Sequence, residues 1–390
     1  MEIKKMKVPT KSLRSAAVLL AAGAVIAGCG ASPTDKASTS GASASGGSDL
    51  QSVYSAVNGL TGTARYNKLL QLAKGAGGSI GFYHSGDMTK EVSAFEKATG
   101  LKVNDFQATS ERVMERVTQE QQASRQGSDV VLGGQNDMKS LNDQGGLAQL
   151  NTPAFSDVGT DFKSAYDISP IAIMEMPTYN TDKVSAGKLP KSWEGLFQNP
   201  PGRLGIEITD QDFYETLIRK YFMQQKGMSE QAAINLVTKG YQGAQQVDGH
   251  TLVANLLASG QFAYVPNLYA QYVGKLQKSG APISYDHLAP GMPPFVVNLT
   301  AGLTKGGKNP AGGLLLIEWL MGPDGQKVIA DQHYVPTSKE YQGQTLLEQY
   351  PNAIVQNFYL TDTAAQAADW KAKFQTLLQS IGGKPATQSS

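Results

Sequence analysis

Five segments of the chain gather hydroxyl, imidazole, carboxylate and amide side chains, the groups that bind small molecules or act on them. Four of the segments follow a short apolar run typical of a strand, and the segment from Asp248 to Thr251 precedes a predicted helix. Ligands of open α/β sheets bind at the carboxyl ends of the strands, so a site is expected in these segments. The candidate ligand-binding residues are Tyr83, His84, Ser85, Asp87, Gly134, Gln135, Asp210, Asp212, Tyr214, Asp248, His250, Thr251, Asn267 and Tyr269.

These residue types also have structural uses. An Asp before a helix commonly accepts a hydrogen bond from the first turn as an N-cap, and this alternative stays open for Asp212 and Asp248. His84 is equally compatible with an ordinary loop imidazole. His287 and His333 lie outside the five segments, and we expect both to be structural.

The sequence carries no motif for metal-dependent catalysis or for nucleotide hydrolysis. It has no His-Glu-x-x-His or P-loop pattern. The chain has 4 His and 1 Cys, which excludes a zinc-ribbon array or a disulfide framework. His84 and Ser85 are adjacent, but adjacency in sequence does not supply the geometry of a catalytic triad. We therefore expect a binding protein with no cofactor, and not an enzyme.

Charge and composition give two further indications of the class of protein. The 390 residues include 34 basic and 33 acidic side chains, so charge gives no argument for a nucleic-acid partner. The hydrophobic fraction is 41% and the charged fraction 17%, which excludes a chain that is disordered throughout.

Strands and helices that alternate along the chain must position these segments. Apolar runs predict strands at residues 79–83, 101–106, 130–132, 202–209, 261–265 and 296–303. Helical periodicity predicts helices at 50–74, 89–99, 109–124, 138–144, 213–226, 229–239, 251–258, 268–277, 310–320, 323–332, 344–350 and 364–381. The alternation predicts an α/β fold with a parallel sheet and right-handed crossovers.

The N-terminus has the organisation of an export signal. A basic stretch with Lys4, Lys7 and Arg14 precedes the apolar run from Ala16 to Gly28. That run is shorter than the roughly 20 residues that span a bilayer. It ends Ile-Ala-Gly-Cys, which matches the lipobox of bacterial lipoproteins and places the only Cys at the site of lipid attachment. We expect a signal peptide at 1–28, a lipid anchor on Cys29 outside the cytoplasmic membrane, and a flexible tether, rich in Ser, Gly and Ala, over 29–50.

Four segments of the body resemble the extracellular solute-binding proteins of bacterial ABC importers, in the group that includes ferric-iron and small-solute binders. The first is Phe95 to Val103, Phe-Glu-Lys-Ala-Thr-Gly-Leu-Lys-Val, and the second is Asp129 to Gly134, Asp-Val-Val-Leu-Gly-Gly. The third runs from Tyr179 to Leu196 and includes Tyr-Asn-Thr-Asp and Leu-Pro-Lys-Ser-Trp, and the fourth runs from Lys308 to Gln326. All four occur in the order found in that family.

The resemblance implies an α/β fold of the type II periplasmic-binding-protein kind, in which two lobes close on a solute about a hinge. Lobe one would comprise residues 51–175 and 290–390, and lobe two residues 176–289, with hinge crossovers in 179–196 and 286–298. The implied partners are a small-molecule or metal-ion solute and a membrane permease with its ATPase. We expect a monomer. A solute sensor on the same fold is a further alternative, since fold alone does not decide function.

The nature of the solute is left open between an organic compound and iron. Ferric-binding relatives use adjacent tyrosines after the strand that here ends near Val265, but Tyr269 and Tyr272 are separated by two residues. An iron site would use Tyr269, Tyr272 and Asp87. The candidate residues are rich in acids and aromatic rings and poor in Arg and Lys, which favours an uncharged or cationic organic solute.

Overall fold

The computed structural model describes residues 49–387. The predicted signal peptide, Cys29 and almost all of the tether lie outside the described residues. Within residues 49–387, no helix is both long and apolar enough to cross a membrane.

A nine-stranded sheet forms the centre of the described chain, with the path β10-β4-β9-β3-β1-β2, and with β11 paired to β9 and β7 and β8 paired to β4. β5 and β6 form a separate parallel pair. The strand bounds are β1 (Ser79–His84), β2 (Lys102–Gln107), β3 (Val130–Gly134), β4 (Asp167–Asn180), β5 (Gly205–Glu207), β6 (Gln245–Val247), β7 (Tyr264–Tyr269), β8 (Ile283–Ser284), β9 (Phe295–Leu303), β10 (Val335–Pro336) and β11 (Ile354–Val355).

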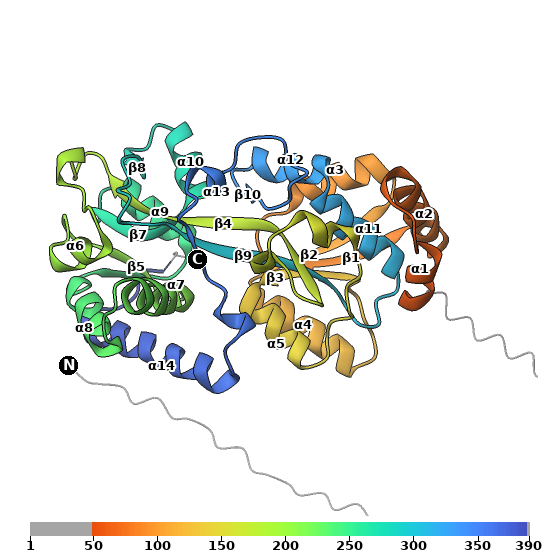
Figure 1. Cartoon of the computed structure of the whole chain (residues 1–390), viewed down its shortest axis with the longest axis horizontal. Helices are drawn as coiled ribbons and strands as arrows, with labels where there is room; N and C mark the ends of the chain where they lie inside the picture. The colour runs from red at the N-terminus through yellow and green to blue at the C-terminus, as the bar shows by residue number, and fades with distance from the viewer. Residues whose placement is uncertain (1–48, 388–390) are drawn as a thin grey trace, which may run out of the picture. The chain divides into compact units, whose positions relative to one another are not determined.

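The predicted parallel pairing holds for only part of the sheet. β1 pairs in parallel with β2 and β3, but β9 runs antiparallel to both β3 and β4. The two long strands β4 and β9 lie side by side through the middle of the molecule (Figure 1). Their antiparallel course follows from the connections, because β9 returns toward the start of the sheet after the chain has built β5 to β8.

Helices cover the sheet and its edges. Their bounds are α1 (Leu50–Ala56), α2 (Gly62–Gly75), α3 (Thr89–Thr99), α4 (Ser110–Gln122), α5 (Gln135–Asp143), α6 (Trp193–Gln198), α7 (Gln211–Thr216), α8 (Glu230–Gly240), α9 (His250–Ala258), α10 (Ala270–Lys278), α11 (Pro310–Met321), α12 (Pro323–Asp331), α13 (Leu346–Gln349) and α14 (Ala364–Ile381). A π-helical segment, Leu217–Gln225, continues α7. The predicted helices at 89–99 and 364–381 are confirmed at both ends.

β4 is a strand that the sequence did not predict. Its 14 residues are all buried, and they include Pro170 and Pro177. Proline cannot donate to a ladder and is confined to edges and bulges. The pairing register of β4 shifts between Ile168 and Ile171 and again between Met176 and Thr178. The two irregularities accommodate the two prolines, which is why a strand persists through a sequence that reads as broken.

Two large apolar clusters stabilise the structure. The first core contains Phe82, Phe95 and Leu314, from β1, α3 and α11. The second core contains Trp193, Phe213 and further side chains from α6 to α8. Phe295 of β9 packs edge-on against both Trp193 and Phe213, so the long strand carries part of the second core.

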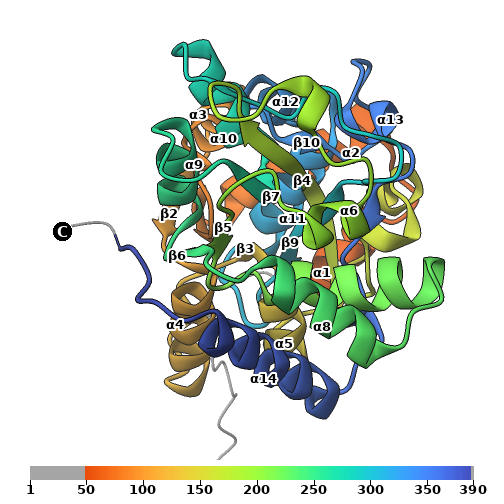
Figure 2. The same cartoon turned by 90° about the vertical axis from the view of Figure 1, so that its left-hand side faces the viewer.

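α14 belongs with the second core. Its Trp370 and Phe374 pack against Tyr214 of α7, and the helix lies along α7 and α8 (Figures 1 and 2). The lobe boundaries, which placed residues 364–381 in the first lobe, stay a prediction.

Candidate ligand-binding site

Four carboxylates from different elements converge where β4, β5 and β7 meet, and we call Glu175, Glu207, Asp210 and Asp212 the acidic cluster. Glu175 lies in the middle of β4, opposite Tyr269 of β7, and is 1% exposed. Glu207 is the last residue of β5 and is also buried. Asp210 and Asp212 stand at the start of α7, directly after that strand. The end of β5 therefore supplies three of the four acids, as expected for a site on an α/β sheet, and the interior of β4 supplies the fourth.

Backbone amides and one Asn hold the first part of the cluster in place. Glu207 accepts from the Thr209 amide (Oε2, 2.6 Å) and from the Gly249 amide (Oε1, 2.9 Å). Gly249 has φ = 111°, a conformation that favours glycine, and this turns its N–H toward the carboxylate. Asn267 Nδ2 donates to Asp210 Oδ2 at 2.6 Å. Asn267 does not contact the other carboxylate oxygen of Asp210, Oδ1.

An aromatic wall adjoins that oxygen. His250, the first residue of α9, places Nε2 3.6 Å from Asp210 Oδ1. Its ring stacks on Tyr269 with centroids 4.0 Å apart, and Tyr269 stacks in turn on Tyr272 at 6.0 Å. The helical spacing of the two tyrosines thus brings their rings together, although they are not adjacent in sequence. Stacked π faces beside carboxylates are an arrangement that attracts cations.

Amide side chains link the cluster to α5 and β11. Asn136 of α5 donates to Asp212 Oδ2 at 2.5 Å. Gln356, which follows β11, donates to the Glu175 carboxylate, and Gln135 donates to the Gln356 carbonyl. The second loop predicted from sequence, with Gly134 and Gln135, therefore reaches the acidic cluster through hydrogen bonds.

No Lys or Arg side chain among the described residues balances the negative charge of the acidic cluster. Among residues 49–387, no Lys or Arg forms an ion pair with any of the four carboxylates. Burial raises the pKa of Glu175 to about 8 and that of Asp212 to about 6. Burial, and then the charges of Glu207 and Glu175, raise the pKa of Asp210 well above its usual range. Burial lowers the pKa of His250. Glu175 and Asp210 therefore favour the protonated form near neutral pH.

A metal ion is a second chemical possibility for part of this site. Glu207, Asp210 and His250 each offer a ligand atom, and these atoms lie within 4.8 Å of one another. Carboxylate and imidazole donors suit several divalent metals. Asp87, which the iron hypothesis added to Tyr269 and Tyr272, lies outside this group, where it accepts from the Thr89 amide at the start of α3.

Several predicted residues lie away from the acidic cluster. Tyr83 donates its hydroxyl to Glu120 at 2.8 Å and packs against α4. His84 is buried, with Nδ1 3.2 Å from the Gly86 carbonyl, and the Ser85 amide donates to Leu132. Tyr214 is buried in the second core.

The fourth predicted segment divides between the site and the surface. His250 reaches the acidic cluster, whereas Asp248 and Thr251 are exposed. The backbone amide of Asp248 donates to the Ala386 carbonyl, and its side chain does not cap α9.

The sequence reasoning missed Glu175, Glu207 and Gln356. A signal for the first two was present, because each is a single acid inside an apolar run, Ile-Ala-Ile-Met-Glu-Met and Leu-Gly-Ile-Glu-Ile. Glutamate is almost never fully buried in a strand unless something pairs with it. Nothing local distinguishes Gln356, whose role depends on where β11 joins the sheet.

Comparison with known proteins agrees with this architecture. A sequence search finds no match among curated proteins. Iron-bound HitA from Pseudomonas aeruginosa superposes with a TM-score of 0.63 at 19% identity, over 77% of this chain and 99% of that one. A Trichodesmium protein, IdiA or FutA, in complex with iron and citrate gives 0.62 at 17% identity, over 78% and 100%. MotA from A. tumefaciens B6 in complex with glucopine gives 0.60 at 13% identity, over 77% and 99%.

These likenesses show the fold, which is that of type II periplasmic binding proteins, as predicted. The family model for bacterial extracellular solute-binding proteins matches residues 90–354, more than half of the chain. Family and fold are those of binding proteins, and no enzyme family is indicated. The chain belongs to the family of bacterial extracellular solute-binding proteins.

Proposed function

We propose that the chain captures a small organic cation at the acidic cluster and delivers it to an ABC permease and its ATPase. The observation that carries the proposal is the set of four carboxylates, three of them buried and Asp212 partly buried, without a Lys or Arg partner among the described residues. Structures of similar fold include the substrate-binding protein of an ABC transporter from Agrobacterium tumefaciens, which supports the transport role.

The physical argument is one of charge compensation. Removing a carboxylate from water without a partner costs several kcal/mol, so the free protein holds protons on Glu175 and Asp210 instead. An ammonium or guanidinium group would replace those protons and donate hydrogen bonds to the same oxygens. The His250 and Tyr269 rings would cover its carbon skeleton. An anionic solute would gain nothing from this lining.

A ferric or divalent metal is the second candidate, favoured by the convergence of Glu207, Asp210 and His250. Phenolate oxygens from Tyr269 and Tyr272 would add hard ligands. Burial and the neighbouring carboxylates raise the pKa of Tyr269 well above its usual range, which opposes phenolate formation in the metal-free protein. This is why the organic cation is the first choice.

The proposal includes closure of two lobes around the solute. β4 and β9 pass through both cores and would carry the hinge, and Asn136 to Asp212 would be a contact between the lobes in the closed form. The contacts of α14 favour its inclusion in lobe two. Solute would shift the open–closed equilibrium only by its differential affinity for the two forms. A sensor would use the same closure without a permease, and reconstituted transport distinguishes the two.

We further propose that Cys29 carries a lipid that anchors the protein on the outer side of the cytoplasmic membrane, and that the protein is a monomer. Incorporation of labelled palmitate into the full chain, abolished by Cys29→Ser, tests the anchor. Light scattering on the purified protein tests the monomer.

The charge proposal is tested by a matched pair of isosteric variants. Asp210→Asn removes an acid of the cluster, whereas Asp248→Asn removes an exposed acid outside it. A charged hydrogen bond contributes about 1.5–3 kcal/mol, so Asp210→Asn should weaken n-butylamine binding by about tenfold or more. Asp248→Asn should leave it within about twofold, because exposed charges contribute little. Equal affinities in the wild type and Asp210→Asn, measured by titration calorimetry, would contradict the proposal.

A further inference from the structure

A small cavity lies beside the acidic cluster, between α5, α7 and the C-terminal segment 356–370. Its volume is about 270 Å³, below the roughly 300–1,000 Å³ of pockets that enclose a whole ligand. It is therefore suited to one end of a solute. Asp212 and Gln356 line it, and Gln356 also donates to Glu175, so the cavity and the cluster share part of their walls.

Two buried side chains in the cavity wall lack a partner for one of their polar atoms. Gln135 is 3% exposed and Gln356 is 1% exposed, and the side-chain oxygen of each accepts no hydrogen bond. In this structure each Nε2 donates to an oxygen, so the unpartnered atom of each amide is an acceptor. Buried acceptors normally have donors, and a group that brings N–H or O–H would supply them.

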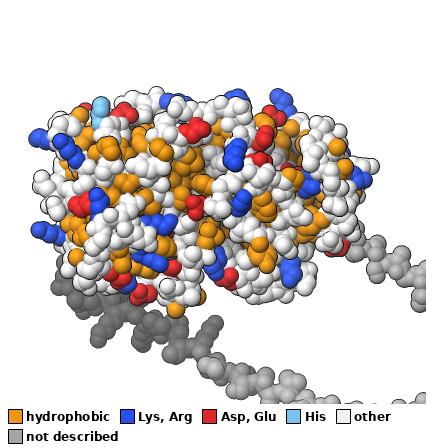
Figure 3. All heavy atoms as spheres, in the orientation of Figure 1, with side chains coloured by type: hydrophobic (Ala, Val, Ile, Leu, Met, Phe, Trp, Pro, Cys, Tyr) orange, Lys and Arg blue, Asp and Glu red, His pale blue; other side chains and the backbone are white. Residues whose placement is uncertain are grey.

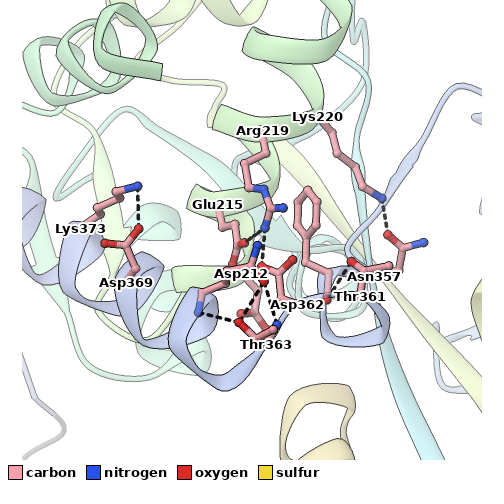
Figure 4. A network of polar contacts seen from close by, with 12 residues as sticks. Asp212, Glu215, Arg219, Lys220, Asn357, Thr361, Asp362, Thr363, Asp369 and Lys373 are labelled. Atoms are coloured by element: carbon pink, nitrogen blue, oxygen red, sulfur yellow. Dashed lines mark hydrogen bonds and ion pairs between the residues drawn. The ribbon is translucent and has the colours of Figure 1, made fainter. Parts of the chain in front are cut away.

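Carboxylates make up most of the charge around the same cavity. Asp212, Glu215 and Asp362 line the cavity. Arg219 forms ion pairs with both Glu215 and Asp362 and lies between them (Figure 4). Lys139 is the one Lys or Arg among the lining residues, and it pairs with Asp143 at 2.5 Å. The wall therefore has an excess of negative charge.

Aromatic rings complete the lining. Phe358 and Trp370 face the cavity from the C-terminal segment, and Arg219 stacks over Phe358 at 3.6 Å. Rings that already hold one cation show that this environment accepts positive charge. The face in Figure 3 has basic and acidic side chains interspersed, which contrasts with the acid excess of this wall.

We propose that this cavity is a second subsite, which binds a second amino or guanidino group of the solute held at the acidic cluster. The inference rests on the proposed function and deepens it, since it makes the solute an elongated dication. The C-terminal segment 356–370 contributes residues to the site, which the family resemblance did not lead us to expect.

α14 offers a matched pair of variants for the test. Ala367 lines the cavity, whereas its neighbour Ala368 does not, and both are exposed on the helix surface. Ala367→Lys places a positive charge at the subsite, and Ala368→Lys adds the same net charge elsewhere. Lys is nearly as favourable as Ala in a helix, so both variants should fold.

The probes are diaminobutane, diaminopentane, diaminohexane and their monoamine counterparts, titrated calorimetrically into the purified protein. We expect at least one diamine to bind about tenfold more tightly than the monoamine of equal length. Ala367→Lys should remove that advantage, and Ala368→Lys should retain it.

The outcomes separate the two proposals. If monoamines bind but every diamine binds no better, or if Ala367→Lys and Ala368→Lys behave alike, the second subsite is overturned and the acidic cluster stands. If neither monoamines nor diamines bind, both proposals fail.

Discussion

Amine binding to the acidic cluster should release about one proton near neutral pH. Glu175 and Asp210 are buried close to one another, and burial together with neighbouring carboxylates raises the pKa of both. A cation that enters must replace a proton held on one of these two acids. Binding is therefore linked to pH, and affinity should rise as the pair ionises.

The magnitude follows from the pKa of Glu175, raised to about 8. The ionised fraction of a group with that pKa is about one-hundredth at pH 6, one-tenth at pH 7 and one-half at pH 8. Affinity for n-butylamine should thus rise about tenfold from pH 6 to 7 and about fivefold from pH 7 to 8. Aliphatic amines stay protonated throughout this range, so the slope reports on the protein.

The free protein should show the opposite trend. An acid whose pKa rises on folding is protonated in the folded state while it is ionised in the unfolded state, so stability falls as pH rises from 4.5 to about 8. Solute should stabilise most where the free protein is weakest. Denaturant unfolding at pH 4.5 and at pH 8, with and without n-butylamine, measures the pH dependence of stability and the effect of the solute on it.

Calorimetry in two buffers of different ionisation enthalpy counts the protons released. We expect about one at pH 7 in the wild type and in the control Asp248→Asn, and fewer in Glu175→Gln, where the amide that replaces Glu175 cannot titrate. A flat pH profile with no proton release would refute the account of the cluster as protonated acid. Proton uptake would refute it as well.

Two further predictions concern stability. Burial raises the pKa of Asp212 to about 6 from 3.8, so the ionised carboxylate lowers the free energy of unfolding by up to about 3 kcal/mol at pH 8. Asp212→Asn should therefore stabilise the free protein at pH 8 but not at pH 4. Equal effects of the substitution in urea unfolding at both pH values would contradict this. A Cβ at Gly81 would lie 1.9 Å from the Gly127 carbonyl oxygen, whereas one at Gly187 would meet nothing within 4 Å. Gly81→Ala should therefore lower the free energy of unfolding by about 3 kcal/mol or more, and Gly187→Ala by less than about 1 kcal/mol. Similar unfolding midpoints for the two variants would exclude the close approach at Gly81.

Local patterns predicted the helices well and the sheet only in part. α3 and α14 were predicted to their last residue, because each has apolar residues at helical spacing and a clear end, such as Gly100 in the left-handed conformation after α3. β4 was not predicted, because Pro170 and Pro177 mark breaks in a sequence window although tertiary pairing tolerates them as bulges. The direction of β9 could not be read from the chain, since strand polarity depends on connections.

The sequence predicted the site residues that stand at or after strand ends. It missed residues whose role depends on burial inside the fold. Asp210 and His250 follow strands, Asn267 and Tyr269 lie in the last residues of β7, and the four do come together. Glu175 is inside a strand, where the sequence gives its identity but not the neighbours that raise its pKa. Tyr83 also ends a strand, yet its side chain faces α4, because alternate residues of β1 point to opposite sides of the sheet.

The central claim is that the site selects positive charge on an organic solute. The most direct measurement is a thermal-shift screen of the purified protein, refolded from denaturant to remove bound solute. The panel should contain amines, guanidines, neutral sugars, phosphonates and ferric citrate at matched concentration. A ligand at about 100 times its Kd adds about 2.7 kcal/mol of stability. We predict stabilisation by amines or guanidines; stabilisation by phosphonates or sugars alone, or by ferric citrate with a tyrosinate-to-iron absorption band, would contradict the account.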